Sequence, residues 1–341
     1  MGGGSLRERC AKSAGEPRRL RATRLVVSCS GLPTPFSGPF FWLRWIPILL
    51  RGFTRSVCAA LACMLALSMP ALAEAAAARR VVSMSPSLTE ILIAVGARAT
   101  LVGVDSYSKK VSPEVADLPT IGGLFNPSLE AVVALEPDLV ALVPSAQQRD
   151  FTNRLEALGI EVLGLPNITL ADVLSSIVAL GERVGRGTAA RAVVARIREN
   201  WRAIGEATSS FEAHSAVLVI QREPLYVVGA GSFIDAMLTA SGLKNAAGIF
   251  EEPYPRVAVE WLIEAAPEVI LDATETAVEP AAYWSRWPSL PAVGAGRTYA
   301  VSASDVTLPG PELDRALRII AELVHGVGGD GGPGTNGGAA P

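Results

Sequence analysis

The sequence has few of the side chains on which most enzyme active sites depend. It contains two histidines and four cysteines among 341 residues, and the last cysteine is Cys63. If an export signal is removed near residue 73, as argued below, all four cysteines are lost. The mature protein then has no thiol for a disulfide bond, a metal site or a nucleophile.

The two histidines are poorly placed for chemistry. His214 comes just before an expected strand, and His325 ends the last expected helix. Neither lies where the loops at the ends of parallel strands converge, which disfavours a catalytic or metal-binding imidazole. The sequence therefore predicts a protein that is not an enzyme and that has neither a metal site nor a cofactor of its own.

The chain also lacks a run of Lys and Arg, and its net charge is −3 at pH 7. This balance argues against nucleic acid as a partner, because binding to phosphates needs a basic surface. The segment "GAGSF" at 229–233 has two glycines of a dinucleotide fingerprint but lacks the third and the trailing acid. It is predicted to be a turn before a helix.

The first 73 residues have the pattern of a targeting region. Residues 49–73 are interpreted as a signal peptide, because Arg51 and Arg55 precede an apolar run and the small-residue triplet ALA follows at 71–73. The run at 56–67 is too short for a membrane span of about 20 residues. Residues 1–48 are expected to be a non-native or disordered extension. We expect a periplasmic protein, with lipid anchoring at Cys63 as the alternative that stays open.

From residue 80 the chain alternates short apolar runs with helical periods, which is the pattern of parallel strands covered by helices. Residues 80–185 and residues 212–326 each form one such α/β lobe. Ser87 and Glu90 have the spacing of a capping box, which predicts that the first helix opens directly after Ser87. The tail at 327–341 is rich in glycine and is expected to be disordered.

Residues 187–208, between the two lobes, are predicted to form one linking helix about 30 Å long. Its apolar residues follow a single narrow stripe, with charged residues on much of the remaining surface. The stripe consists of Val193, Ile197, Trp201 and Ile204.

A repeat relates the two lobes. The segment "LEAVVALEPDLV" at 129–140 returns as "VEWLIEAAPEVI" at 259–270, at a constant offset of 130 without a gap. Glu130 corresponds to Glu260, and Pro137 corresponds to Pro267. The predicted fold is therefore α/β, with two Rossmann-like lobes joined by a single long helix. Two facing lobes enclose a cleft, which is a preferred place for a ligand.

Aromatic residues at strand-to-helix junctions are candidates for the lining of that cleft. Individually each could be ordinary packing, but together they suit a large ligand with apolar surfaces. They are Tyr107, Phe125, Tyr226 and Tyr254. Trp284 and Trp287, by contrast, are expected to be buried in the second lobe.

Glu130 and Glu260 allow two interpretations from spacing alone. An acid in the first turn of a helix complements the helix dipole. Alternatively, one exposed carboxylate on each lobe is suited to docking against paired basic residues of a partner. The residues themselves do not decide between the two.

The segments "RVVSMSPSLTEILIAVGA", "LVGVDSYS" and "LPTIGGLFNPSLEAVVALEPDLV" resemble the periplasmic substrate-binding proteins of ABC importers for cobalamin, iron-siderophores and haem, and most of all the cobalamin branch. The resemblance runs from about residue 80 to residue 324. It implies the class III periplasmic binding protein fold, a monomer, and an ABC permease with its ATPase as the partner. In the family the glutamates at the positions of Glu130 and Glu260 form salt bridges with permease arginines.

The resemblance also implies a ligand site. Tyr107, Tyr254 and Asp305 match family pocket positions, and Tyr226 fits them less closely. Leu124 stands where the cobalamin branch has a tryptophan, for which Phe125 is a substitute.

A corrinoid is therefore the expected ligand. An iron-siderophore or haem is the alternative within the family, and a two-lobed α/β enzyme is a remote alternative. An anionic siderophore would require arginines in the cleft. The candidates are Arg149, Arg222 and Arg256.

Overall fold

The computed structural model describes residues 77–124 and 126–327. The expected extension at 1–48, the signal peptide at 49–73 and residues 328–341 of the expected tail lie outside the described residues. Within the described part, no helix is both long and apolar enough to cross a membrane.

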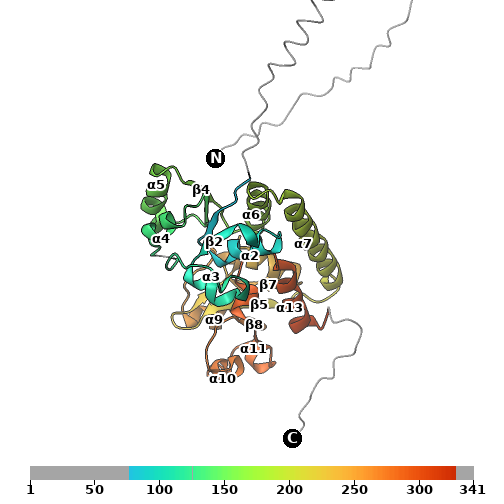
Figure 1. Cartoon of the computed structure of the whole chain (residues 1–341). Helices are drawn as coiled ribbons and strands as arrows, with labels where there is room; N and C mark the ends of the chain where they lie inside the picture. The colour runs from blue at the N-terminus through green and yellow to red at the C-terminus, as the bar shows by residue number, and fades with distance from the viewer. Residues whose placement is uncertain (1–76, 125, 328–341) are drawn as a thin grey trace, which may run out of the picture. The chain divides into compact units, whose positions relative to one another are not determined.

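The first lobe contains a four-stranded sheet in which all strands are parallel, in the order β2-β1-β3-β4 (Figure 1). Each strand is followed by helix, as the alternating pattern predicts. The main elements are β1 (Val81–Ser83), α2 (Pro86–Ala94), β2 (Leu101–Val104), α3 (Ser106–Val111), α4 (Leu129–Ala134), β3 (Leu139–Leu142), α5 (Arg149–Ala157), β4 (Glu161–Gly164) and α6 (Leu170–Arg183).

The second lobe has the same strand order. Its parallel strands run β7-β5-β8-β9, and β6 adds an antiparallel partner to β5. The main elements are β5 (Ser215–Gln221), β6 (Tyr226–Val227), α8 (Phe233–Ala240), β7 (Lys244–Asn245), α9 (Val259–Ala265), β8 (Val269–Asp272), α10 (Pro280–Trp284), α11 (Pro291–Gly294), β9 (Thr298–Ala300), α12 (Ala303–Val306) and α13 (Leu313–His325). The predicted α/β fold with two Rossmann-like lobes is confirmed.

Helices cover both faces of each sheet, because successive side chains of a strand point to opposite faces. In β1, Val81 belongs to a core that includes residues of α2 and α6, whereas Val82 packs in a separate core with α4 and α5. In β5, Leu218 joins the first of these cores, and Val217 packs in a third core with α9, α10 and α11. One apolar core therefore continues from the first lobe into the second.

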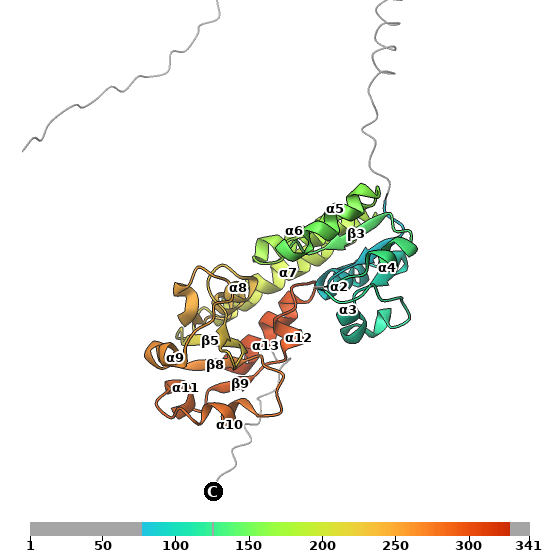
Figure 2. The same cartoon turned by 90° about the vertical axis from the view of Figure 1, so that its left-hand side faces the viewer.

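The helix α7 (Gly187–Thr208) occupies the range expected for the linking helix (Figure 2). Its 22 residues give it a length of about 33 Å. All four residues of the expected stripe belong to the shared core or pack against it. Arg196 and Asn200 of α7 also donate hydrogen bonds to the buried carboxylate of Asp314 in α13, at 3.1 and 2.6 Å. The linking helix is thus fixed firmly to the second lobe.

The repeat has the same backbone conformation in both lobes. Glu136 and Ala266, which are 130 residues apart, are the two non-glycine residues with positive φ in the described part, at 46° and 45°. Each follows its helix and lies directly before the repeated proline. The two segments also have the same pattern of burial from Leu129 to Leu139 and from Val259 to Val269, except at the second acid. The sequence repeat is therefore a structural repeat.

The second acid of the repeat has a structural role in each lobe. The carboxylate of Asp138 accepts hydrogen bonds from the backbone N–H of Arg79 and Arg80, at 3.0 and 3.1 Å. Glu268 accepts one from the backbone N–H of Ser215 at 2.9 Å. Both acids thus satisfy backbone donors at the start of the neighbouring strand.

The capping box predicted for Ser87 and Glu90 is wrong. Helix α2 begins at Pro86, and Ser85 is its N-cap residue without a side-chain capping bond. The hydroxyl of Ser87 instead lies 2.9 Å from the hydroxyl of Ser85. Proline at the first position needs no N–H partner, so the helix starts two residues earlier than the pattern suggested. The carboxylate of Glu90 therefore does not cap α2 and can form contacts outside this helix.

Candidate functional site

A cavity of about 210 Å³ lies between the two lobes. Glu90 and Val111 line it from α2 and α3 of the first lobe. Its second wall comes from α12, α13 and the loop between them. The residues of that wall are Ser304, Asp305, Leu308, Gly310, Pro311, Glu312, Arg315 and Ala316. The predicted site residue Asp305 is therefore at the junction of the lobes, where its carboxylate lies 3.5 Å from the guanidinium of Arg315.

Each lobe has a further cavity at the carboxyl ends of its parallel strands, the usual ligand position in open α/β sheets. In the first lobe a cavity of about 480 Å³ is lined by residues that end β3 and β4, including Leu142 and Gly164, and by Arg149. In the second lobe a cavity of about 410 Å³ is lined by Arg222, Thr274 and other residues that follow β5 and β8. Three cavities thus occupy strand ends or the junction between lobes.

Tyr107 begins α3 and is 48% exposed. The carboxylate of Asp105 caps this helix and accepts the N–H groups of Tyr107 and Ser108, at 2.9 and 3.0 Å. Tyr107 precedes Val111, which lines the inter-lobe cavity, by one helical turn, so the two residues share a face of α3. The backbone of this tyrosine is therefore fixed while its ring stays accessible.

Tyr226 and Tyr254 lie on adjacent segments of the second lobe. Tyr226 forms a β-bridge with Arg256, and the N–H of Val227 donates to the carbonyl of Pro255 at 3.1 Å. Tyr254 packs partly against the shared core, and burial raises the pKa of its phenol to about 12. It therefore stays neutral at physiological pH.

The loop before α4 is only partly described. The side-chain amide of Gln148 donates a hydrogen bond to the backbone carbonyl of Leu124 at 2.7 Å, which ties this loop to the start of α5. Phe125 lies outside the described residues. Leu124, Tyr226 and Tyr254 do not line any of the three cavities described above.

Arg222 forms an ion pair inside the second lobe, with only its Nη2 left without a hydrogen-bond partner there. It is 7% exposed, and its Nε lies 2.9 Å from the buried carboxylate of Asp272. The same guanidinium donates to Thr276 Oγ1 and to the carbonyl of Val278, at 2.9 and 2.8 Å. Its charge is therefore compensated inside the lobe, and it holds the loop that borders the cavity.

The carboxylate of Asp272 accepts several hydrogen bonds. Besides Arg222, it accepts hydrogen bonds from Trp284 Nε1 at 2.7 Å and from the N–H of Thr274 at 3.1 Å. Trp284 is 1% exposed, as expected from the sequence, whereas Trp287 is only half-buried against the same core. Sequence analysis did not single out Asp272, although an acid at the end of an otherwise apolar strand was a signal for it.

Glu130 and Glu260 are both exposed, in the first turns of α4 and α9. Hydrogen bonds from its own backbone N–H and then from the hydroxyl of Ser128 lower the pKa of Glu130, so it is charged at neutral pH. In Figure 1 both helices lie on the left, opposite α7, and Figure 2 shows them from that side.

Glu90 was missed as a site residue, although it is the single acid in the apolar helix α2. It accepts a hydrogen bond from the hydroxyl of Ser112 in the first lobe. Burial is the main cause that raises the pKa of its carboxyl, and the charges of Glu114 and Glu312 act in the same direction. The inter-lobe cavity therefore favours the protonated form of Glu90.

The substitution Glu90→Gln tests this position. Because the folded-state pKa is raised, the ionised carboxylate destabilises the wild-type fold as the pH rises from about 4.5, the ordinary value, through the raised pKa. We expect Glu90→Gln to have the wild-type melting temperature at pH 4 and a higher one at pH 7, measured by circular dichroism. Glu251→Gln is the control, because this exposed glutamate neither lines the cavity nor contributes to the raised pKa of Glu90. An equal difference from wild type at both pH values would contradict the assignment.

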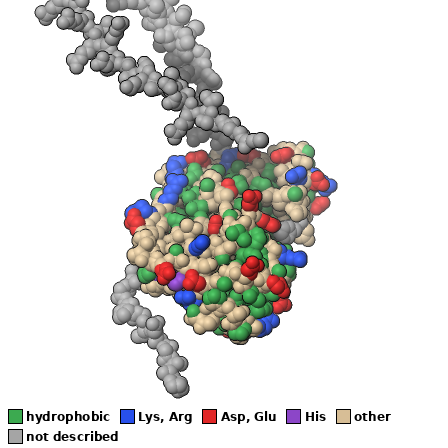
Figure 3. Space-filling view, turned by 180° about the vertical axis from the view of Figure 1, so that it is seen from behind, with side chains coloured by type: hydrophobic (Ala, Val, Ile, Leu, Met, Phe, Trp, Pro, Cys, Tyr) green, Lys and Arg blue, Asp and Glu red, His purple; other side chains and the backbone are tan. Residues whose placement is uncertain are grey.

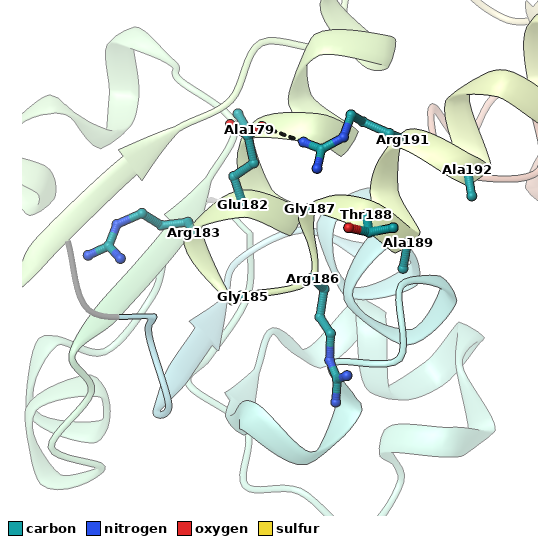
Figure 4. A pocket seen from close by; sticks show the side chains of 10 residues that line it. All are labelled: Ala179, Glu182, Arg183, Gly185, Arg186, Gly187, Thr188, Ala189, Arg191 and Ala192. Atoms are coloured by element: carbon teal, nitrogen blue, oxygen red, sulfur yellow. Dashed lines mark hydrogen bonds and ion pairs between the residues drawn. The ribbon is translucent and has the colours of Figure 1, made fainter. Parts of the chain in front are cut away.

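A larger cavity, about 1040 Å³, lies at the turn between α6 and α7 and is lined by residues from 179 to 192. Arg183, Arg186 and Arg191 point in different directions there (Figure 4). Arg191 pairs with Glu182 at 2.9 Å, and Arg183 pairs with Glu161. Because its arginines do not converge, this cavity is a poor candidate for the ligand site.

No group of three or more His, Cys, Asp and Glu side chains within residues 77–124 and 126–327 could hold a metal ion. His325 stacks on Phe211 and lies 2.8 Å from the carbonyl of Ser241, while His214 pairs with Glu268. The face in Figure 3 mixes acidic and basic side chains.

Two α/β lobes of equal topology, a fixed linking helix and cavities at strand ends define a two-lobed binding protein. Its sequence matches the pattern of the periplasmic binding protein family over residues 81–299. The chain belongs to this family, as the sequence resemblance predicted.

The chain is similar to a vitamin B12-binding protein of Vibrio campbellii, with 26% identity over 248 residues that cover 72% of this chain and 88% of the relative. It is also similar to an ABC transporter substrate-binding lipoprotein of Bacillus subtilis, with 28% identity and coverage of 72% and 80%. Among solved structures, the periplasmic vitamin B12-binding protein of Vibrio cholerae superimposes with a TM-score of 0.65, 23% identity and coverage of 72% and 96%. The last similarity concerns the fold alone.

Proposed function

We propose that this chain is the substrate-binding component of an ABC importer that captures cobalamin or a related corrinoid. The ligand would lie in the cleft between the lobes and pass from there to a membrane permease with its ATPase. The observation that carries the choice of ligand is the similarity to the vitamin B12-binding protein of Vibrio campbellii. The ion pair of Arg222 with Asp272 agrees with this choice, because a ferric siderophore with several carboxylates would need unpaired arginines in the cleft, and one of the three candidates is already paired.

The side chains proposed as ligand contacts suit a large and largely uncharged molecule. Tyr107, Tyr226 and Tyr254 offer aromatic faces, and Leu124 and Phe125 add apolar surface. Asp305 would accept a hydrogen bond from an amide at the edge of a corrin. Glu130 and Glu260 would dock the protein on the permease. No covalent chemistry is proposed for these groups.

The proposal includes the organisation expected from the sequence. The lobes at 80–185 and 212–326 flank the linking helix at 187–208, and the signal peptide at 49–73 directs a monomer to the periplasm. The relative from Bacillus subtilis bears the name of a lipoprotein, which supports lipid anchoring as the alternative to signal cleavage.

Titration of the purified mature chain tests the ligand. We expect cobalamin and cobinamide to quench tryptophan fluorescence in a saturable manner at one ligand per chain, because a bound corrinoid absorbs light near Trp261, Trp284 and Trp287 of the second lobe. Ferric siderophores and haem should leave the signal unchanged after correction for absorbance. Quenching by a ferric chelate or haem alone would disprove the corrinoid assignment.

Tyr107→Ala provides the site-directed part of this test. Loss of an aromatic contact is expected to weaken cobalamin binding about tenfold, whereas Tyr107→Phe should retain it. Phe211→Ala is the matched control, because Phe211 is similarly exposed at 42% but stacks on His325. An equal effect of both alanine substitutions would remove Tyr107 from the site.

A further inference from the structure

Val133 and Ile263 are exposed aliphatic residues at equivalent positions of the repeat. Each is 38% exposed. Each follows the exposed glutamate of its helix, Glu130 in α4 or Glu260 in α9, by three residues. Residues three apart on a helix are neighbours on one face. Each lobe therefore presents a carboxylate and an aliphatic side chain next to each other.

A single exposed aliphatic residue needs no explanation, because most protein surfaces carry several. The recurrence is what distinguishes this pair. Among the large apolar residues exposed in the described part of the chain, only Val133 and Ile263 are separated by the repeat offset of 130. The intervening residue Val132 and its counterpart Leu262 are both buried, so packing inside the lobe is already provided by other positions of the same helices.

We propose that Val133 and Ile263 form the apolar half of the surface that docks on the permease, each entering a recess beside a cationic side chain of that partner. This inference rests on the proposed function and extends it from two charges to two mixed contacts. A carboxylate gives orientation and fast encounter. Buried apolar surface in the middle of a contact slows release.

The charges select the partner. A second copy of this chain in the same contact would place Glu130 and Glu260 against like charges. An anionic membrane surface would repel them in the same way. A protein surface with two similar sites, each with a cation next to an apolar recess, matches both lobes at once.

The test uses the full chain in a strain of the source organism that lacks the chromosomal copy. Val133→Gln and Ile263→Gln together should lower the initial rate of uptake about tenfold, with ligand affinity and melting temperature unchanged. Uptake is measured with radiolabelled cyanocobalamin, or with the ferric chelate or haem if that compound saturates the purified chain. Val133→Leu with Ile263→Leu should retain uptake, because the surface stays apolar. Leu323→Gln on α13 is the control, with 37% exposure.

The outcomes separate this inference from the proposed function. If reversal of Glu130 and Glu260 lowers uptake but the glutamine variants do not, the apolar contacts are disproved and the docking function stands. If neither change lowers uptake, both docking proposals are wrong. Equal losses from the glutamine and the leucine variants would also overturn the inference, because an apolar recess accepts leucine.

Discussion

Reversing both exposed charges of the repeat, with Glu130→Arg and Glu260→Arg in one chain, is expected to lower ligand uptake by about 100-fold. Each reversal replaces an attraction with a repulsion, and close charge pairs at interfaces couple strongly enough for about tenfold or more each. Ligand affinity should not change, since both glutamates are exposed and neither is among the proposed ligand contacts. The measurements are uptake by the complemented deletion strain and cobalamin titration of the purified protein.

Glu322→Arg is the charge-matched control for this experiment. Glu322 is also exposed on a helix, but α13 lies away from α4 and α9. Its reversal should leave uptake unchanged. If the double reversal at Glu130 and Glu260 preserved uptake, both residues would return to the alternative role of complementing the helix dipole.

The substitution Asp272→Asn is expected to cause the largest loss of stability. It leaves the buried guanidinium of Arg222 without its counter-charge, and breaking such a pair costs about 3–5 kcal/mol. For a fold of this size we expect a melting temperature about 10 °C lower, measured by calorimetry. Because Arg222 also holds Thr276 and Val278, ligand affinity should fall as well.

A double-mutant cycle distinguishes loss of the pair from general damage. Replacing Arg222 by Met together with Asp272→Asn removes both charges, so the combined loss should be smaller than the sum of the single losses. Glu199→Gln breaks the exposed pair with Arg202 in α7 and should not change the melting temperature. A wild-type melting temperature for Asp272→Asn would show that the buried charge is not required.

The candidate site was only partly predictable. Tyr107 and Asp305 were found because a strand that ends in a short helix leaves a recognisable local pattern. Glu90 was assigned to a capping box, since its spacing from Ser87 fits that motif. Its true neighbour, the cavity wall of α12 and α13, is more than 200 residues away in the chain, and no local pattern encodes that proximity.

Arg222 shows that a residue proposed from the sequence can also prove to have a structural partner. In the sequence it was one of three equivalent candidates for an anion clamp. The pairing of β5 with β8 places Arg222 next to Asp272, 50 residues further along the chain. The ion pair between them compensates the charge of Arg222 inside the lobe. Side-chain partners across strands depend on sheet order and register, which single residues do not reveal.

The sequence by itself determined the α/β class, the two lobes and the linking helix, because alternating hydrophobic periods and a constant offset are properties of local order along the chain. The tertiary structure decided which acids are exposed and which are buried, and which of the three candidate arginines forms a buried ion pair. Those properties follow from desolvation and pairing between distant segments, and they exist only once the sheets have assembled.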